Sequence, residues 1–277
     1  MSYVTVGQEN GQDIQIYFED HGQGQPVVLI HGFPLNGHSW ERQEVALLEA
    51  GYRVITYDRR GFGASSQPSA GYEFDTFAAD LDMLLKHLDL NNVVLAGFSM
   101  GCGEVARYLG KFGSGRIAKA IFAAPIAPYL VKTGDNPEGV DKSVFDGIMD
   151  AIRTDRPAFF KGFFQNFYNA DVFMGTRVSD EVLQASFNVA VGSSARATLA
   201  CVPAWLNDFR ADVASIKIPT LTVQGDADRI LPIDATGARL PKLIEGSEYV
   251  VIKDGPHAIG WTHAEELNKA MLDFISK

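Results

Sequence analysis

The segment Asn92-Val93-Val94-Leu95-Ala96-Gly97-Phe98-Ser99-Met100-Gly101 decides the fold. Residues 93–96 are an unbroken apolar run, which is typical of a strand buried on both faces of a parallel sheet. Its second half has the pattern G-x-S-x-G, in which glycines two residues before and after a serine permit a sharp turn from strand to helix. The segment therefore predicts a strand, a strained turn and a helix, with the Ser99 hydroxyl presented above the sheet.

The same alternation of strands and helices extends over most of the chain. Short apolar runs indicate buried strands at residues 27–30, 54–57, 93–96, 117–123, 220–223 and 249–252, and two earlier runs at 3–6 and 13–19 suit an antiparallel edge. Apolar residues at three- and four-residue spacing predict helices over 40–50, 74–88 and 103–112. Repeated β-α-β units of this kind define an α/β protein with a mostly parallel sheet.

The alternation stops between about residues 126 and 212, where helical patterns replace the strands. Because the sheet pattern resumes afterwards, we expect a single domain over residues 1–277 with a helical cap inserted at about 126–212. One helix face in this segment is almost wholly aromatic, with Phe159, Phe160, Phe163, Phe164, Phe167 and Tyr168. Core packing explains such a stripe, and the alternative is a pocket wall shared with Trp205.

The composition is that of an ordinary globular protein, with 46% hydrophobic and 21% charged residues. The net charge of −10 disfavours binding to nucleic acid and to anionic membranes. The N-terminus has no basic region followed by an apolar stretch, and no segment has the length that a membrane span needs. We therefore expect a cytoplasmic protein without nucleic-acid or membrane partners.

The two cysteines, Cys102 and Cys201, do not make a disulfide framework in a chain of 277 residues, and both are expected to be reduced. Cys102 falls where the helix after Ser99 needs a small packing residue. No group of His, Cys and acidic residues has the sequence spacing of metal ligands, so we expect no metal. Residues 101–106 fit G-x-G-x-x-A, but no acidic residue follows about 20 positions later, so dinucleotide binding is rejected.

A serine hydroxyl becomes a nucleophile only when a base takes its proton and a further group orients that base. Among the histidines, His257 follows the last strand and the loop Gly255-Pro256, which suits the base. Two aspartates follow the strand before it, and Asp228 is favoured over Asp226 because an Asp directly after glycine commonly ties down its own turn. The remaining histidines are less well placed: His21, His31, His38, His87 and His263. Near the last of these, Thr262 and Glu265 predict a capping box.

Two backbone N–H groups are candidates for stabilising negative charge on a substrate oxygen. Met100 lies at the start of the helix after Ser99, and Phe33 follows the strand at 27–30. Pro34 biases Phe33 away from helical angles, and the alternative is that this proline only makes the turn rigid. The segment 58–65 is interpreted as a turn ordered by charge pairs and not as a catalytic loop.

At this point the chain resembles the α/β-hydrolase superfamily over essentially its whole length, and more closely the cofactor-free bacterial haloperoxidases, arylesterase-perhydrolases and γ-lactamases. The blocks that carry the resemblance are His31-Gly32-Phe33-Pro34-Leu35 through Ser39-Trp40, Tyr57 to Gly63, Gly97-Phe98-Ser99-Met100-Gly101, Gly225-Asp226-Ala227-Asp228 with Leu231-Pro232, and Gly255-Pro256-His257. One departure is Ala258-Ile259, where many relatives have glycine and leucine, and this affects the expected pocket shape.

The resemblance implies an α/β-hydrolase fold with a mostly parallel eight-stranded sheet, flanking helices and a helical cap. It implies Ser99 as nucleophile, Asp228 as acid and His257 as base, with Phe33 and Met100 as oxyanion donors and with no metal, haem or other cofactor. For the substrate pocket we predict Pro34, Trp205 and Ile259.

The expected function is hydrolysis of carboxylic esters through an acyl-enzyme, together with perhydrolysis by hydrogen peroxide. The partners are thus a small ester, carboxylic acid or lactam and peroxide, and a homo-oligomer is compatible with the sequence. The alternatives are a γ-lactamase or amidase acting on small cyclic amides, and a non-catalytic small-molecule-binding protein on the same fold. Haloalkane dehalogenation is excluded because it needs a carboxylate in the place of Ser99.

Overall fold

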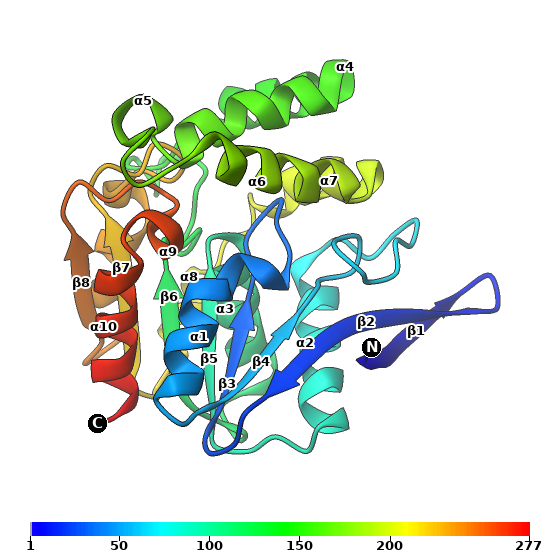
Figure 1. The fold of residues 1–277 in the computed structure, drawn as a ribbon, viewed down its shortest axis with the longest axis vertical. Coiled ribbons are helices and arrows are strands. Elements are labelled where there is room, and N and C mark those ends of the chain that lie inside the picture. Colours follow the sequence, from blue (N-terminus) through cyan, green and yellow to red (C-terminus); the bar gives the residue numbers. More distant parts are fainter. Residues whose placement is uncertain (1) are drawn as a thin grey trace.

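The computed structural model describes residues 2–277, which contain one eight-stranded sheet (Figure 1). The strands are β1 (Ser2–Glu9), β2 (Gln12–His21), β3 (Pro26–Ile30), β4 (Arg53–Tyr57), β5 (Val93–Phe98), β6 (Ile117–Ala123), β7 (Thr220–Gly225) and β8 (Glu248–Ile252). Their order is β1-β2-β4-β3-β5-β6-β7-β8, and only the pairs β1–β2 and β2–β4 are antiparallel. The predicted strands and the antiparallel edge are confirmed.

Helices cover both faces of this sheet. On one face lie α1 (Glu41–Glu49), α9 (Ile259–Thr262) and α10 (Ala264–Ile275), and on the other lie α2 (Phe74–His87), α3 (Met100–Phe112) and α8 (Arg210–Ala214) (Figure 1). The 3₁₀ helices are η1 (Gly37–Trp40), η2 (Ile233–Ala235) and η3 (Gly237–Lys242). No helix formed by residues 2–277 is long and apolar enough to cross a bilayer.

Two helix starts differ from the sequence expectation. The third predicted helix begins at Met100 and not at residue 103, because α3 starts directly after the turn at Ser99. The predicted capping box of Thr262 and Glu265 is wrong. Thr262 is the last residue of α9, and its hydroxyl donates to the Ala258 carbonyl at 3.0 Å, while His263 precedes α10 without a side-chain cap.

The central strands form a rigid support for the residues that follow them. The side chains of β3 from Val27 to Ile30 have no exposed surface, and the same holds for β5 from Val93 to Ala96. Burying one such aliphatic side chain contributes about 1.5–3 kcal/mol, so these strands resist displacement. The loops at their carboxyl ends therefore start from fixed positions.

Between Ala123 and Thr220, a segment that the structure describes throughout, the chain forms helices and isolated bridges and adds no strand to the sheet. The helices α4 (Lys142–Phe167), α5 (Ala170–Phe173), α6 (Asp180–Gly192) and α7 (Ala195–Ala204) lie across one end of the sheet (Figure 1). The assignment of residues 126–212 as a cap within one domain stays a prediction.

The long helix α4 bends at Asp155, whose backbone angles are φ −155° and ψ 88°. The carboxylate of Asp155 accepts from the Ala158 N–H at 3.0 Å, as an N-cap does. Pro157 stands in the first turn of the second half, where its missing N–H is tolerated. The bend directs residues 156–167, with the aromatic stripe, across the end of the sheet.

Candidate active site

Ser99 occupies a strained turn between β5 and α3. Its backbone angles are φ +54° and ψ −116°, which a residue with a side chain rarely adopts. A Cβ at Gly97 would lie 2.6 Å from the Gly101 carbonyl oxygen, and a Cβ at Gly101 would collide with the Ile30 carbonyl. Both glycines of the G-x-S-x-G pattern are thus required by close approach of backbones.

The structure brings Ser99, His257 and Asp228 together in one chain of hydrogen bonds. The Ser99 Oγ lies 2.8 Å from His257 Nε2, and His257 Nδ1 lies 2.8 Å from Asp228 Oδ2. The side chains of His257 and Asp228 are completely buried, and Ser99 is 7% exposed. Because the carboxylate accepts from Nδ1–H, Nε2 is left to accept the serine proton.

The two candidate aspartates have different partners. Asp228 Oδ1 accepts from the N–H groups of Ile230 and Leu231, each at 2.9 Å, so the oxygen that does not contact His257 braces the turn. Asp226 instead accepts from the Asp254 N–H at 2.6 Å and fastens the β7 loop to the loop before His257. The expectation that Asp226 ties its own turn is therefore wrong, although Asp228 is the residue next to the histidine.

Sequence reasoning missed Gln224, a buried residue of β7 that supports Asp228. Its Nε2 donates to the Leu231 carbonyl at 2.9 Å and approaches Asp228 Oδ2 at 3.3 Å. Its Oε1 accepts from the Gly237 N–H at 2.9 Å. A glutamine at the end of a wholly buried strand was the one available signal, since such a group needs several partners.

Two aromatic rings pack against His257. The ring centroids of Phe98 and Phe167 each lie 5.1 Å from that of the imidazole, and the Ala258 N–H donates to the Phe167 carbonyl at 3.0 Å. Phe167 ends α4, so the helix above the sheet holds the loop that carries the histidine. The sequence placed Phe98 in the turn motif and Phe167 in the aromatic stripe but predicted neither contact.

A cavity of about 500 Å³ lies beside Ser99. Its lining is mainly apolar and includes Phe33, Met100, Phe145, Ile148, Phe159, Phe163, Trp205, Ile230 and Leu231. Of the predicted pocket residues, Trp205 lines this cavity and Pro34 and Ile259 do not. Ile259 is wholly buried because it begins α9 and packs into the core, and Pro34 is buried beside Phe33.

The aromatic stripe of α4 serves both of the purposes that the sequence left open. Phe160 and Phe164 are buried in the hydrophobic core. Phe159 and Phe163 line the cavity beside Ser99. The stripe thus divides along its helix face into core residues and pocket residues.

The two predicted oxyanion donors, Phe33 and Met100, line the same cavity as Ser99. Met100 is the first residue of α3, where an N–H has no partner within the helix. The loop carrying Phe33 is fixed from behind by Arg59, whose guanidinium donates to the His31 carbonyl at 3.0 Å and pairs with Glu104 of α3 at 2.7 Å. Arg60 pairs with Asp80 at 2.6 Å, so the predicted charge pairs of this turn are present.

His31 and the cysteines are unsuited to proton transfer or nucleophilic attack. Burial lowers the pKa of His31 well below its usual value, and both ring nitrogens are engaged, with Gly32 O at 2.8 Å and with the Arg59 N–H at 2.9 Å. Burial raises the pKa of Cys102 well above its usual value and that of Cys201 to about 12. Both thiols are free and buried, which fits packing.

Within residues 2–277 one group of side chains is close enough to share a metal ion: Glu19, His21 and Glu44, whose ligand atoms lie within 4.8 Å of one another. Glu19 also accepts from the Tyr17 hydroxyl at 2.5 Å. The group belongs to β2 and α1 and includes none of the residues around Ser99. Sequence spacing gave no sign of it, because strand pairing and helix docking bring the residues together.

A serine at a strand-to-helix turn, with a histidine and a carboxylate at the same end of a mostly parallel sheet, defines an enzyme of the α/β-hydrolase type. The model of the alpha/beta hydrolase fold family matches residues 25–264. The chain therefore belongs to the α/β-hydrolase family, in the subgroup of non-heme haloperoxidases and perhydrolases that its sequence resembles.

Three relatives illustrate this membership. A putative non-heme chloroperoxidase from Synechocystis sp. is 65% identical over 275 residues, which cover 99% of this chain and all of that protein. A bifunctional esterase/perhydrolase from Acinetobacter calcoaceticus is 31% identical, with 99% of each chain covered. The crystal structure of a bromoperoxidase from Bacillus anthracis superposes with a TM-score of 0.96 at 46% identity, covering 100% of this chain and 99% of the other.

Proposed function

We propose that this enzyme hydrolyses carboxylic esters through an acyl-enzyme on Ser99 and also transfers the acyl group to hydrogen peroxide. The observation that carries the proposal is the continuous hydrogen-bond chain from Asp228 through His257 to Ser99 beside an apolar cavity. The names of the relatives, which include esterase/perhydrolase and non-heme haloperoxidase, support the choice of both reactions.

In acylation, Ser99 Oγ attacks the ester carbonyl carbon while His257 Nε2 takes the serine proton. The carbonyl oxygen becomes negative, and the N–H groups of Phe33 and Met100 are the proposed donors to it. The tetrahedral intermediate then collapses. The bond to the alkoxide breaks, and the histidinium returns the proton to that leaving group, so an alcohol departs and the acyl group stays on Ser99.

In deacylation, His257 takes a proton from water or from hydrogen peroxide, and the resulting nucleophile attacks the acyl carbon. Water gives the carboxylic acid and peroxide gives the peracid, and in both cases the proton returns to Ser99. A peracid then oxidises bromide outside the enzyme, which yields carboxylate and hypobromous acid. The haloperoxidase reaction thus needs no bound redox cofactor.

Pro34 is the residue proposed to favour peroxide over water. By restricting the conformation of Phe33, it holds the Phe33 carbonyl where that oxygen accepts a hydrogen bond from the second hydroxyl of the peroxide. Water lacks this hydroxyl. The expected effect is a bias between the two nucleophiles and not an absolute switch, since a net hydrogen bond is worth about 1 kcal/mol.

Incubation with an aryl acetate, with and without peroxide, tests the proposal. A burst of phenol followed by steady turnover is expected, together with peracid when peroxide is present. A panel that includes a small γ-lactam separates the esterase from the lactamase alternative. If none of these substrates gives a burst or turnover, the alternative of a non-catalytic small-molecule-binding protein is supported instead.

A further inference from the structure

A second cavity, of about 460 Å³, adjoins the rings of Phe98 and Phe167 that pack on His257. Most of its lining comes from η1, α1, α6 and α9, with single residues from β5, α4 and α10, and it includes none of Ser99, Phe33 and Met100. It is nearly as large as the cavity beside Ser99. Nothing in the proposed ester chemistry uses this space.

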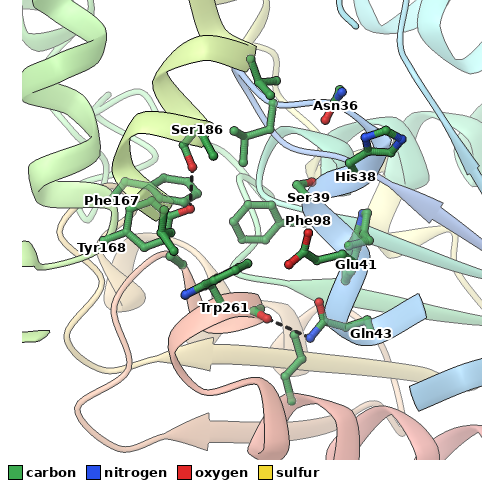
Figure 2. A pocket seen from close by; sticks show the side chains of 18 of the residues that line it. Asn36, His38, Ser39, Glu41, Gln43, Phe98, Phe167, Tyr168, Ser186 and Trp261 are labelled. Atoms are coloured by element: carbon green, nitrogen blue, oxygen red, sulfur yellow. Dashed lines mark hydrogen bonds between the residues drawn. The ribbon is translucent and has the colours of Figure 1, made fainter. Parts of the chain in front are cut away.

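The walls of the second cavity are aromatic. They include Trp40, Phe98, Phe167, Tyr168 and Trp261. Figure 2 shows Phe98 amid the labelled side chains, with Phe167 and Tyr168 on one side and Ser39, Glu41 and Gln43 on the other. The Tyr168 hydroxyl lies 2.8 Å from Ser186 Oγ, so this contact joins the residue directly after α4 to α6. Such a surface suits a flat aromatic ring.

Gln43, which lines this cavity, has a buried acceptor without a donor. The residue is 1% exposed, and its Nε2 donates to the Gly260 carbonyl and to Asn268 Oδ1, each at 3.0 Å. These two bonds fix the amide so that Oε1 has no donor, and Figure 2 shows this oxygen turned toward Glu41. A buried acceptor without a donor is unfavourable, and a ligand N–H would satisfy it.

Three further lining residues have buried polar atoms without a partner: the Nε1–H donors of Trp40 and Trp261 and the Oγ of Ser39. They match a ligand that also carries a hydrogen-bond acceptor such as a carbonyl oxygen. Glu41 and Glu181 lie at the exposed part of the lining, so a negatively charged ligand is disfavoured.

We propose that this second cavity is a binding site for a neutral, flat aromatic amide. The ring lies among Phe98, Phe167 and Trp261, and the amide N–H donates to Gln43 Oε1. The site is distinct from the proposed ester site, since no residue of the hydrogen-bond chain lines it.

Titration of the full-length protein with 2-naphthamide tests the chemistry of the site. Calorimetry should show saturable binding, and the methyl ketone 2-acetonaphthone, which lacks the N–H, should bind about tenfold more weakly. The anion 2-naphthoate should bind more weakly still. Equal affinities for the amide and the ketone, or no saturable binding of the amide below about 1 mM, would overturn the proposal.

Cavity-filling variants test the location. Ala185, exposed on α6, lines the second cavity, and Ile148 lines the cavity beside Ser99. Ala185→Trp should weaken 2-naphthamide binding more than tenfold, while Ala185→Ser, Ile148→Trp and Ser99→Ala should each leave it within about twofold. Thermal melting checks that each variant is folded. Loss of binding in Ile148→Trp with retention in Ala185→Trp would assign the ligand to the other cavity and refute the proposal.

Discussion

The loops at the carboxyl ends of the strands and the helix α4 contribute to the candidate site in different ways. At the carboxyl ends of the strands, Ser99, Asp228 and His257 follow β5, β7 and β8, and glycines and turn hydrogen bonds fix their directions locally. Phe163 and Phe167 reach the site from above, and their position depends on how the whole helix docks. Local backbone geometry thus holds the reacting groups, whereas long-range packing shapes the space around them.

The largest effect on ester turnover is expected at the carboxyl ends of the strands, where Ser99 and His257 lie. Ser99→Ala should lower ester turnover on the order of 10⁴-fold or more because no acyl-enzyme forms, and His257→Ala should be comparably severe. Alanine is small enough for the turn, so circular dichroism should show an unchanged fold. Wild-type turnover of an aryl acetate by Ser99→Ala would refute the assignment of the nucleophile.

The two aspartates offer a matched pair within one loop. Asp228→Asn should reduce kcat by up to about 10⁴-fold because the histidine loses its orienting acceptor, whereas Asp226→Asn should keep kcat within about tenfold. Asp226 contacts only the backbone of Asp254 among the hydrogen bonds found for its carboxylate. The reverse ranking in steady-state kinetics would move the role to Asp226.

Two neighbouring phenylalanines of α4 allow the pocket role and the core role of this helix to be tested separately. Phe163 lines the cavity beside Ser99, and Phe164 is 1% exposed in the core. Phe163→Ala should raise the KM for an aryl ester about tenfold with little loss of stability. Phe164→Ala should instead cost about 3–5 kcal/mol in unfolding free energy. Equal effects of both variants on KM and on denaturant midpoint would contradict the division of the stripe.

A smaller effect is expected at Pro34. In an acetate ester plus peroxide, Pro34→Leu should lower the ratio of peracid formation to hydrolysis about fivefold, which corresponds to one net hydrogen bond. Both products are measured in the same reaction mixture, so a general loss of activity cancels. An unchanged ratio would remove Pro34 from the choice of nucleophile.

Treatment with a thiol-alkylating reagent should not change the activity of the native enzyme. Because burial raises the pKa of both thiols, neither forms a thiolate near pH 8, and iodoacetamide should leave native activity intact while labelling both after unfolding. Inactivation of the native enzyme by this reagent would give one cysteine a role that the geometry does not support.

The eight strands were predictable because short apolar runs bounded by turn residues are typical of strands in a buried sheet. The serine and histidine were predictable for the same local reason, although they are 158 positions apart. The residues favour Asp228 over Asp226 only by a turn argument, since both candidates follow the same strand, and their hydrogen bonds distinguish them directly.

Sequence patterns do not predict which residues support the histidine and the aspartate. Gln224, Phe98 and Phe167 act through contacts that arise only when strands align and α4 docks. Of the three predicted pocket residues, Trp205 lines the cavity beside Ser99, whereas Pro34 and Ile259 do not. Ile259 is close to His257 in the chain, but the short helix α9 turns its side chain into the core.

The central claim is that Ser99 carries the acyl group, and mass spectrometry of the protein quenched in acid during turnover of an aryl acetate tests it directly. The account predicts one added acetyl group, located on the peptide that contains Ser99 and absent from Ser99→Ala. An unmodified protein during the burst, or an acetyl group on another residue that turns over at the same rate, would contradict it.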